Sequence, residues 1–414
     1  MNISKKISCL CCLCFALTSV SYSQTVYDPN TGKLTNLNGQ ETSLEDAARP
    51  ISTAVPFLNI SPDSRAGAMG DAGVATSPDV YSAQWNPAKY AFAQKDYGLA
   101  VSYTPWLRKL VDDMYIAYLS GYTKIRKEDA LYFSFTYFNL GKIDFTDNVG
   151  NKYLEFTPKE YAINAGYSRI LSDYLSVSVG VKFINSNLAG NFTSSIGTES
   201  KPSRSVAGDI GLYWNKEFVA GTMNSKFAWG VAVTNLGSKI SYTNNSKKDF
   251  IPTNLRAGVA YTLDLDLYNK LTFTVDGNKL LVPSPPVYYK GTTEIYKGKD
   301  PDRSLQSGIL GSFSDAPAGG KEELKEITMS YGMEYWYSEV FALRVGHFRE
   351  NVLKGNRKYF TAGMGLKFYD GKAGIDFSYL VSGRQNNPLE GTLRFSLNVE
   401  LEKPGEKETE SITE

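Results

Sequence analysis

The chain has 414 residues, and its 44 Lys and Arg residues nearly balance its 43 Asp and Glu residues, which leaves a formal net charge of +1. This balance predicts no basic face for nucleic acid. All four cysteines, Cys9, Cys11, Cys12 and Cys14, lie near the N-terminus, so the rest of the chain has no disulfide and no thiolate metal site.

Residues 1–23 have the pattern of a secretory signal peptide. Lys5 and Lys6 precede an apolar run over 7–20, and the small residues Ser21 and Ser23 fit a cleavage site after Ser23. The run is shorter than the roughly 18 residues of a membrane-spanning helix. No later run reaches that length, so we expect membrane insertion through strands, after a polar extension over 24–53.

Residues 54–95 precede the first strand and show neither strand alternation nor a long helical period. The stretch "GAMGDAGVATSPD" places Gly67, Gly70 and Gly73 three residues apart, followed by Pro78. A dinucleotide fingerprint requires a different spacing and a long helix after it. We therefore predict a compact plug in which glycines allow close backbone packing, and no phosphate site.

Alternation with a period of two residues predicts strands over most of the remaining chain. In "YLSVSVGVKF", for example, Val177, Val179 and Val181 share one face. The predicted strands cover 97–103, 114–122, 130–139, 160–168, 174–184, 206–214, 226–235, 254–263, 270–277, 326–336, 341–348, 358–368, 373–381 and 391–401. The predicted strands number 14, and bacterial outer-membrane barrels likewise have an even number of strands.

The connections between these strands alternate between short and long. Short links such as "ILSD", "YSEV" and "YDGK" follow the even strands, whereas the link over 278–325 follows an odd one. A soluble sandwich has no reason for this sorting, but an outer-membrane barrel does. Aromatic residues such as Tyr103 and Trp106 at strand ends fit interfacial girdles. The predicted fold is all-β, a 14-stranded antiparallel transmembrane barrel over 96–401 with an N-terminal hatch in its lumen.

The predicted inward face is small and polar. We expect small residues there, namely Gly98, Ala100, Ser102, Gly166, Ser168, Gly258, Ala260, Gly346 and Gly363, and also charged ones, namely Lys182, Asp209, Arg256, Asp276, Glu334, Arg344, Asp376 and Arg394. The charges either pair across the lumen and with Arg65 and Asp71, or are solvated in a wet pore. Both arrangements disfavour an apolar tunnel. An acidic tail over 402–414 is predicted to be periplasmic.

The segment "LNISPDSRAGAMGDAGVATSPD", followed by "SAQWNPAKYAF", resembles the PorV family of the type IX secretion system of Bacteroidetes, within the FadL-like transporter superfamily. The resemblance assigns a hatch motif to Arg65, Gly67, Gly70, Asp71, Gly73, Trp85, Asn86, Pro87 and Ala88. It also covers the strand count and the loop pattern. The chain departs from many barrels in continuing past its last strand with a charged tail.

The resemblance implies an outer-membrane carrier that binds the C-terminal signal domain of cargo leaving the translocon. It delivers this cargo to a sortase-like attachment complex at the cell surface. The implied partners are the translocon barrel, cargo signal domains, the attachment complex and outer-membrane lipid or lipopolysaccharide, with no nucleic acid and no cofactor. Candidate contact residues are Trp106, Leu107, Leu110, Val111, Pro285, Pro286, Tyr288, Tyr289 and Tyr296.

Two other functions are considered. A FadL-type transporter of hydrophobic molecules would share the fold and need an apolar path past the hatch. A lipid A O-deacylase would need His347, the only histidine, as a base for an unidentified serine. No G-x-S-x-G motif occurs, and His347 is predicted to face outward as an interfacial aromatic. We expect no enzyme and no metal site.

Overall fold

The computed structural model describes residues 25–36, 38–146, 152–188, 190, 200–243, 248–383 and 387–403. The predicted signal peptide and residues 404–414 of the predicted tail lie outside this range. The chain forms two compact units, one of residues 53–280, 327–350 and 357–414, and a smaller one that combines the N-terminal 52 residues with 281–326 and 351–356. No helix in the described ranges is long and apolar enough to cross a membrane.

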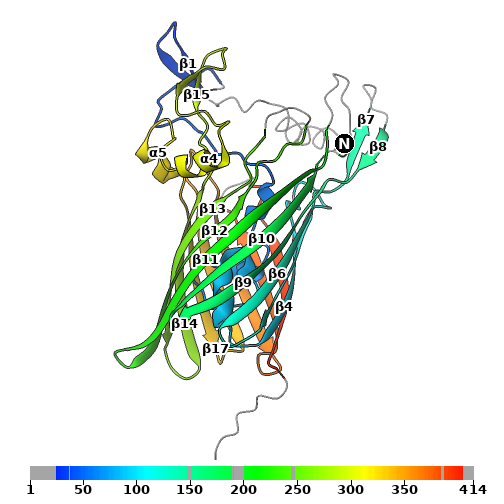
Figure 1. Cartoon of the computed structure of the whole chain (residues 1–414), viewed down its shortest axis with the longest axis vertical. Coiled ribbons are helices and arrows are strands. Elements are labelled where there is room, and N and C mark those ends of the chain that lie inside the picture. The colour runs from blue at the N-terminus through cyan, green and yellow to red at the C-terminus, as the bar shows by residue number, and fades with distance from the viewer. Residues whose placement is uncertain are drawn as a thin grey trace, which may run out of the picture. The chain divides into compact units, whose positions relative to one another are not determined.

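The larger unit is a closed barrel in which every strand is antiparallel to its neighbours (Figure 1). Its described strands are β4 (Tyr97–Pro105), β5 (Tyr115–Lys124), β6 (Asp129–Asn139), β9 (Lys159–Ser172), β10 (Leu175–Asn187), β11 (Ser203–Ala220), β12 (Met223–Gly237), β13 (Asn254–Asp264), β14 (Asn269–Leu280), β17 (Thr328–Tyr337), β18 (Phe341–Arg349), β19 (Lys358–Phe368), β20 (Ala373–Val381) and β21 (Leu393–Leu401). The barrel closes between β21 and β4, where Leu397 lies opposite Val101.

The prediction of a 14-stranded antiparallel barrel is confirmed. Each predicted strand overlaps one barrel strand, because the alternation that predicts it is local. The alternation between short and long connections is also present, with one addition. The connection between β6 and β9 contains a hairpin of β7 (Ile143–Thr146) and β8 (Lys152–Phe156), which the sequence pattern did not indicate.

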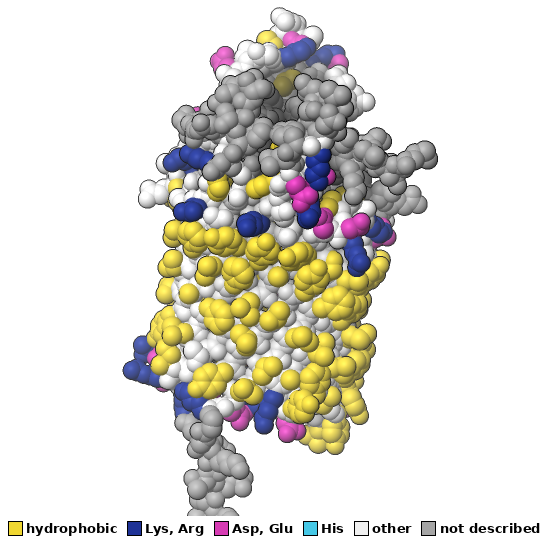
Figure 2. Space-filling view, turned by 90° about the vertical axis from the view of Figure 1, so that its right-hand side faces the viewer, with side chains coloured by type: hydrophobic (Ala, Val, Ile, Leu, Met, Phe, Trp, Pro, Cys, Tyr) yellow, Lys and Arg dark blue, Asp and Glu magenta, His cyan; other side chains and the backbone are white. Residues whose placement is uncertain are grey.

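The barrel wall has its polarity reversed relative to a soluble protein. In β4, Gly98, Ala100 and Ser102 are buried, whereas Leu99 and Val101 are about half exposed. The same alternation in the other strands produces the apolar band of Figure 2, which charged side chains border at both edges. Such a band is what a lipid bilayer requires of a barrel's outer face.

The segment before β4 fills the lumen (Figure 1) with four short helices, η1 (Pro56–Asn59), α2 (Ser64–Ala68), α3 (Ser82–Trp85) and η2 (Pro87–Phe92). Asp63 caps α2 by accepting a hydrogen bond from the Ala66 amide, and Asn86 caps η2 in the same way through Ala88. α2 contacts β18 to β21, and η2 contacts β6, β9, β10 and β11. The segment therefore contacts two separate arcs of the wall, and we call it the hatch.

The smaller unit contains a sheet ordered β16-β15-β1-β2-β3. Its elements are β1 (Thr25–Asp28), β2 (Lys33–Asn36), β3 (Glu41–Thr42), β15 (Val287–Tyr289), β16 (Ile295–Lys297), α4 (Leu305–Gly311) and α5 (Gly320–Lys325). β1 pairs with β15 in parallel. The sequence predicts a polar extension over 24–53 and a long loop over 278–325, whereas the structure combines most of both segments into this unit.

The apolar band predicts a depth-dependent penalty for charge. Val181 lies in the middle of β10 and is 64% exposed, and Val219 lies near the β11–β12 turn and is 67% exposed. We expect Val181→Arg to lower the free energy of unfolding in lipid vesicles by about 2–4 kcal/mol, and Val219→Arg by about 0–1 kcal/mol. Urea titration measures both values. Equal losses at the two positions would contradict the assigned membrane depth.

Candidate functional site

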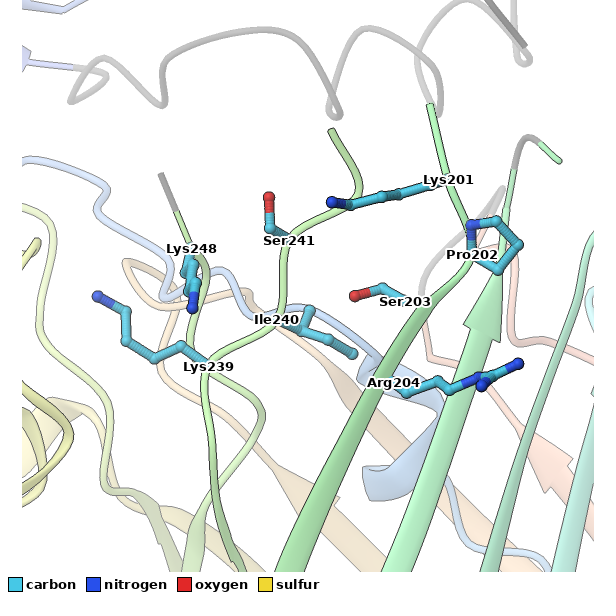
Figure 3. Close-up of a pocket in the computed structure, with 8 residues that line it drawn as sticks. All are labelled: Lys201, Pro202, Ser203, Arg204, Lys239, Ile240, Ser241 and Lys248. Carbon is cyan, nitrogen blue, oxygen red and sulfur yellow. The ribbon is translucent and has the colours of Figure 1, made fainter. Parts of the chain in front are cut away.

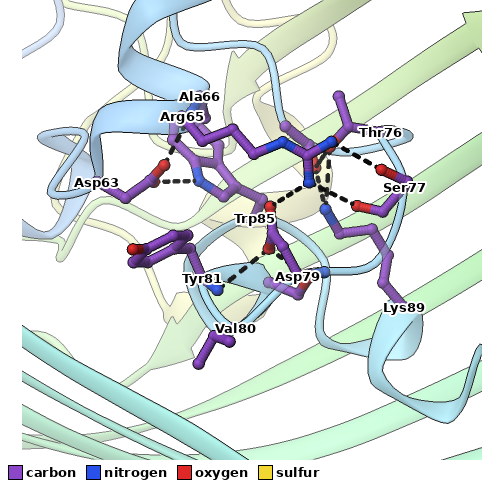
Figure 4. A network of polar contacts seen from close by, with 12 residues as sticks. Asp63, Arg65, Ala66, Thr76, Ser77, Asp79, Val80, Tyr81, Trp85 and Lys89 are labelled. Carbon is purple, nitrogen blue, oxygen red and sulfur yellow. Dashed lines mark hydrogen bonds and ion pairs between the residues drawn. The ribbon is translucent and has the colours of Figure 1, made fainter. Parts of the chain in front are cut away.

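Arg65 fixes the hatch to the barrel wall. Its guanidinium donates through Nε and Nη2 to the two carboxylate oxygens of Glu334 in β17, at 2.9 and 2.8 Å. It also donates through Nη1 to Asp79 at 2.8 Å and through Nη2 to the Ser77 hydroxyl at 2.7 Å, within the hatch (Figure 4). One planar cation therefore joins the two halves of the hatch and binds them to a strand.

The ion pair continues along the inner face of the wall. Arg344 in β18 donates to Glu334 at 2.7 Å and to Asp376 in β20 at 2.6 Å. The side chains of Arg65, Glu334, Arg344 and Asp376 are each at most 9% exposed. Charges of alternating sign thus form a continuous buried row, which we call the charge row. Each member compensates the desolvation of its neighbours, and removal of one leaves an unpaired buried charge.

The glycine stretch does bind an anion, but that anion is a side chain of the barrel. The amides of Gly73 and Val74 donate to one oxygen of Asp276 in β14, at 2.7 and 2.9 Å. On the other side, the buried Lys89 ammonium donates to the Gly73 carbonyl at 2.8 Å and to Thr76 at 3.1 Å. The backbone groups that a phosphate would need are therefore occupied by groups of the chain itself.

The three glycines are required by close approach. A Cβ atom on Gly70, which has φ +68°, would lie 2.7 Å from the backbone nitrogen and oxygen of His347. A Cβ on Gly73 would lie 2.6 Å from the Trp85 ring, and one on Gly67 would lie 2.9 Å from Arg394. At each position a Cβ atom would force a neighbour to move, and at Gly70 that neighbour is backbone, so hatch and wall pack backbone against backbone there.

The rest of the predicted hatch motif also contacts the wall or the hatch itself. The Trp85 indole donates to Asp63 at 2.7 Å, and the Asn86 amide donates to the Leu212 carbonyl of β11 at 2.8 Å. The carbonyls of Pro87 and Ala88 accept hydrogen bonds from Ser168 and Ser176, each at 2.7 Å. Asp71 accepts a hydrogen bond from the Tyr359 hydroxyl at 2.5 Å and lies 3.7 Å from Arg394. All nine predicted residues therefore lie in one packed region.

The predicted contact residues of the β4–β5 connection differ in their exposure. Trp106 is half-buried and packs against an apolar cluster that includes Phe57 of the hatch and Ile116 of β5. Leu107 and Val111 are half-buried, and Leu110 is 45% exposed. Trp106 therefore closes over the hatch, while Leu110 is available to a partner.

The predicted contact residues of the smaller unit are packed more tightly than an open loop would be. Tyr296 stacks on Tyr27 with ring centroids 3.9 Å apart, and Tyr289 meets both rings edge-on. Tyr288 and Pro285 are half-buried and Pro286 is buried. These residues therefore build the unit. The most exposed large apolar side chains of this unit are instead those of Leu310 in α4 and Leu324 in α5, at 75% and 70% exposure. The sequence did not indicate them, because isolated leucines in short helices leave no periodic signal.

Ion pairs join the three segments of the smaller unit. Glu322 in α5 accepts hydrogen bonds from Arg49 at 2.9 and 2.6 Å and from Lys354 at 2.7 Å, and Lys354 also donates to Glu326 at 2.8 Å. Burial alone would raise the pKa of Glu322, but the hydrogen bonds from Arg49 and Lys354 outweigh it and hold the pKa below the usual value of 4.5.

His347 lies on the outward face of β18, as predicted. Its ring is 4.4 Å from Phe360 and 6.4 Å from Tyr331 between centroids, and Nδ1 lies 3.1 Å from the Tyr359 carbonyl oxygen. These neighbours are those of an interfacial aromatic residue. No described carboxylate or hydroxyl is hydrogen-bonded to its ring.

A cavity of about 510 Å³ lies where β11 begins and where β12 and β13 are connected. It is lined by Lys201, Pro202, Ser203, Arg204, Lys239, Ile240, Ser241 and Lys248 (Figure 3). Arg204 points away from the three lysines. A basic and polar lining of this kind does not suit a hydrophobic small molecule.

A closed barrel with an apolar outer band and an ion-paired hatch defines the chain as a barrel protein of the outer membrane. The family model of the type IX secretion system protein PorV matches residues 43–287, which is more than half of the chain. The chain therefore belongs to the PorV family and is an outer-membrane protein of the type IX secretion system.

Several solved barrel structures are similar to the chain at low identity. The Ralstonia pickettii toluene transporter TbuX has a TM-score of 0.44 and 12% identity, with 84% of this chain and 99% of that chain covered. The P. putida toluene transporter TodX has a TM-score of 0.45 and 9% identity, with 83% of this chain and 99% of that chain covered. A Pseudomonas aeruginosa FadL homologue has a TM-score of 0.39 and 11% identity, with 85% of this chain and 99% of that chain covered. No curated protein matches the chain by sequence.

The charge row predicts that Glu334→Gln destabilises the barrel by about 3 kcal/mol, because the buried Arg65 and Arg344 would both lose the carboxylate that they share. Thermal unfolding in detergent measures the loss, and limited proteolysis detects release of the hatch. The matched control is Glu217→Gln, which removes an exposed partner of Lys226 and should change nothing measurable. Equal effects of the two variants would refute an anchoring role.

The lowered pKa of Glu322 predicts an acid-sensitive smaller unit. Because the folded-state pKa lies below the unfolded value, the stabilisation is fully present above pH 4.5 and is lost as the pH falls through the folded pKa. We expect the hydrogen-exchange protection factors of residues 281–326, which correct for the intrinsic pH dependence of amide exchange, to fall in that range. Glu322→Gln should exchange faster at pH 7 and lose most of the pH dependence. An unchanged pH profile in this variant would contradict the assignment.

Proposed function

We propose that this protein carries secreted cargo from the type IX translocon to the surface attachment complex by binding the C-terminal signal domain of the cargo. The observation that carries the proposal is the combination of PorV family membership with a hatch bonded to the wall on opposite arcs. A barrel filled in this way serves as a rigid platform and not as a conduit. Function then depends on the surfaces that its connections and the smaller unit present.

The inner face supports the carrier over the transporter of hydrophobic molecules. The charge row and the contacts of Asp276 with Gly73 and Val74 fill the lumen with polar groups. An alkyl or aromatic guest would have to displace these groups and leave charges unpaired, which is costly in a low-dielectric interior. No observation in the described part of the chain favours an apolar path.

The proposed contact surface is apolar and lies on short, rigid elements. In the smaller unit, Leu310 and Leu324 expose most of their side chains on α4 and α5. In the larger unit, Leu110 is a separate candidate contact and exposes nearly half of its side chain on the β4–β5 connection. The tyrosine stack and the Glu322 ion pairs hold the segments of the smaller unit together. Preformed apolar anchors lose little entropy on binding. We place the long connections and the smaller unit at the cell surface, since long loops of outer-membrane barrels are extracellular.

The test is affinity capture from gently solubilised outer membrane, with quantification of cargo that still carries its signal domain. We expect the double variant Leu310→Asp/Leu324→Asp to capture at least about tenfold less cargo than the wild type, because two apolar anchors become charged. The matched control is Leu267→Asp, at a 95% exposed leucine in the β13–β14 turn, which should leave capture unchanged. Full capture by the double variant would reject the proposed contact surface. If the wild-type protein co-purified only with lipid or fatty acid, without cargo or translocon, the carrier function would be rejected.

A further inference from the structure

Two cations face each other on the outer side of the barrel wall. Arg349, the last residue of β18, lies directly opposite Lys358, the first residue of β19. Directly opposed residues of antiparallel strands hold their Cβ atoms about 5 Å apart, and like charges in this arrangement are destabilising. The pair therefore needs an explanation that the strand register does not supply.

No carboxylate in the described residues compensates this pair. Neither Arg349 nor Lys358 takes part in any described ion pair, and the nearby Glu350 is bound to Arg357 by hydrogen bonds of 2.9 Å. Arg349 has the uncharged Met329 opposite it on its other side.

Other strand-end cations of the wall have either an acid or an uncharged residue opposite them, as with Lys159 at the start of β9, which lies opposite Asn139 and Asn187. At the short-turn end, Lys226 lies opposite Glu217 and forms an ion pair with it at 3.3 Å. Lys270 lies opposite Asp264, at 3.8 Å, and also binds Glu339 at 2.8 Å. Arg349 and Lys358 differ from these cases, because each has another cation directly opposite it.

The position of the pair indicates what its counter-ion is. Arg349 continues the outward face of β18 after Leu343, Val345 and His347, and Lys358 precedes Phe360 on the outward face of β19. The side chains of Leu343, Val345 and Phe360 are exposed, as the apolar band requires. The cations thus lie one step beyond the aromatic residues that mark the membrane interface, at the end with long connections.

We infer that Arg349 and Lys358 together bind the phosphate of a lipid head group in the outer leaflet. Arginine offers a planar set of donors that bind a phosphate in bidentate fashion, and lysine adds a compact charge from the opposite strand. A phosphate monoester, the form that lipid A carries, has more negative charge than a single carboxylate at neutral pH, so one such group compensates both cations. The acyl chains of the same lipid would lie along the Phe360 and Val345 face.

The experiment compares the full-length wild type, Arg349→Gln/Lys358→Gln and the control Lys226→Gln in detergent micelles. The probes are diphosphoryl lipid A, the same lipid without its phosphates, and inorganic pyrophosphate, and native mass spectrometry measures bound probe per barrel. Each cation contributes roughly a fivefold gain in affinity for an anionic lipid. The double variant should therefore retain at least about tenfold less diphosphoryl lipid A than the wild type. Lys226→Gln should bind as the wild type does, and the lipid without phosphates should bind weakly to all three.

Three results would overturn the inference. The first is equal retention of diphosphoryl lipid A by the wild type and the double variant. The second is equal binding of the lipid with and without phosphates. The third is binding of pyrophosphate in place of lipid A, which would assign the pair to a soluble anion. The swapped variant Arg349→Lys/Lys358→Arg keeps both charges, so it should retain the lipid, and it separates loss of charge from loss of fold.

Discussion

In a barrel whose lumen is filled by a hatch, a buried charge on the inner wall is costly unless an opposite charge lies beside it, because the protein interior solvates it poorly. The charge row meets this constraint with members from three strands and from the hatch. Arg65 is the member that the wall cannot supply, so without the hatch Glu334 would lose one of its two cations. The wall and the hatch are for this reason one electrostatic structure, and neither is complete alone.

Small wall residues make room for this arrangement. A Cβ atom on Gly363 would contact Ala68 and one on Gly332 would contact Met69, so the hatch backbone lies against strands that lack side chains at those points. Serine residues on other strands then donate to hatch carbonyls. Close packing at the glycines and hydrogen bonds from these serines together hold the hatch against the wall. The inward residues therefore serve to hold the hatch in place. The proposed recognition of partners then depends on the connections and on the smaller unit.

The sequence predicts the barrel well because its signal is local. Alternation in a strand such as β10 depends on neighbouring residues only, and lipid selects the same outward pattern in every strand. The hatch was predictable from its glycines, although the partner of Arg65, Glu334, could be named only as one of several inward charges. The smaller unit was not predictable. Its strands have only two to four residues, too few for a periodic signal. Its contacts also join residues far apart in the sequence, such as Tyr27 and Tyr296.

The parallel pairing of β1 with β15, which places Val26 opposite Tyr288, has a consequence for how the molecule forms. Residues at the N-terminal end of the described chain have partners that come much later, and α2 of the hatch packs on β18 to β21. Closing such large loops has an entropic cost before any contact compensates it, which makes assembly slow. β1 and α2 therefore complete their contacts only after later strands of the chain have been made.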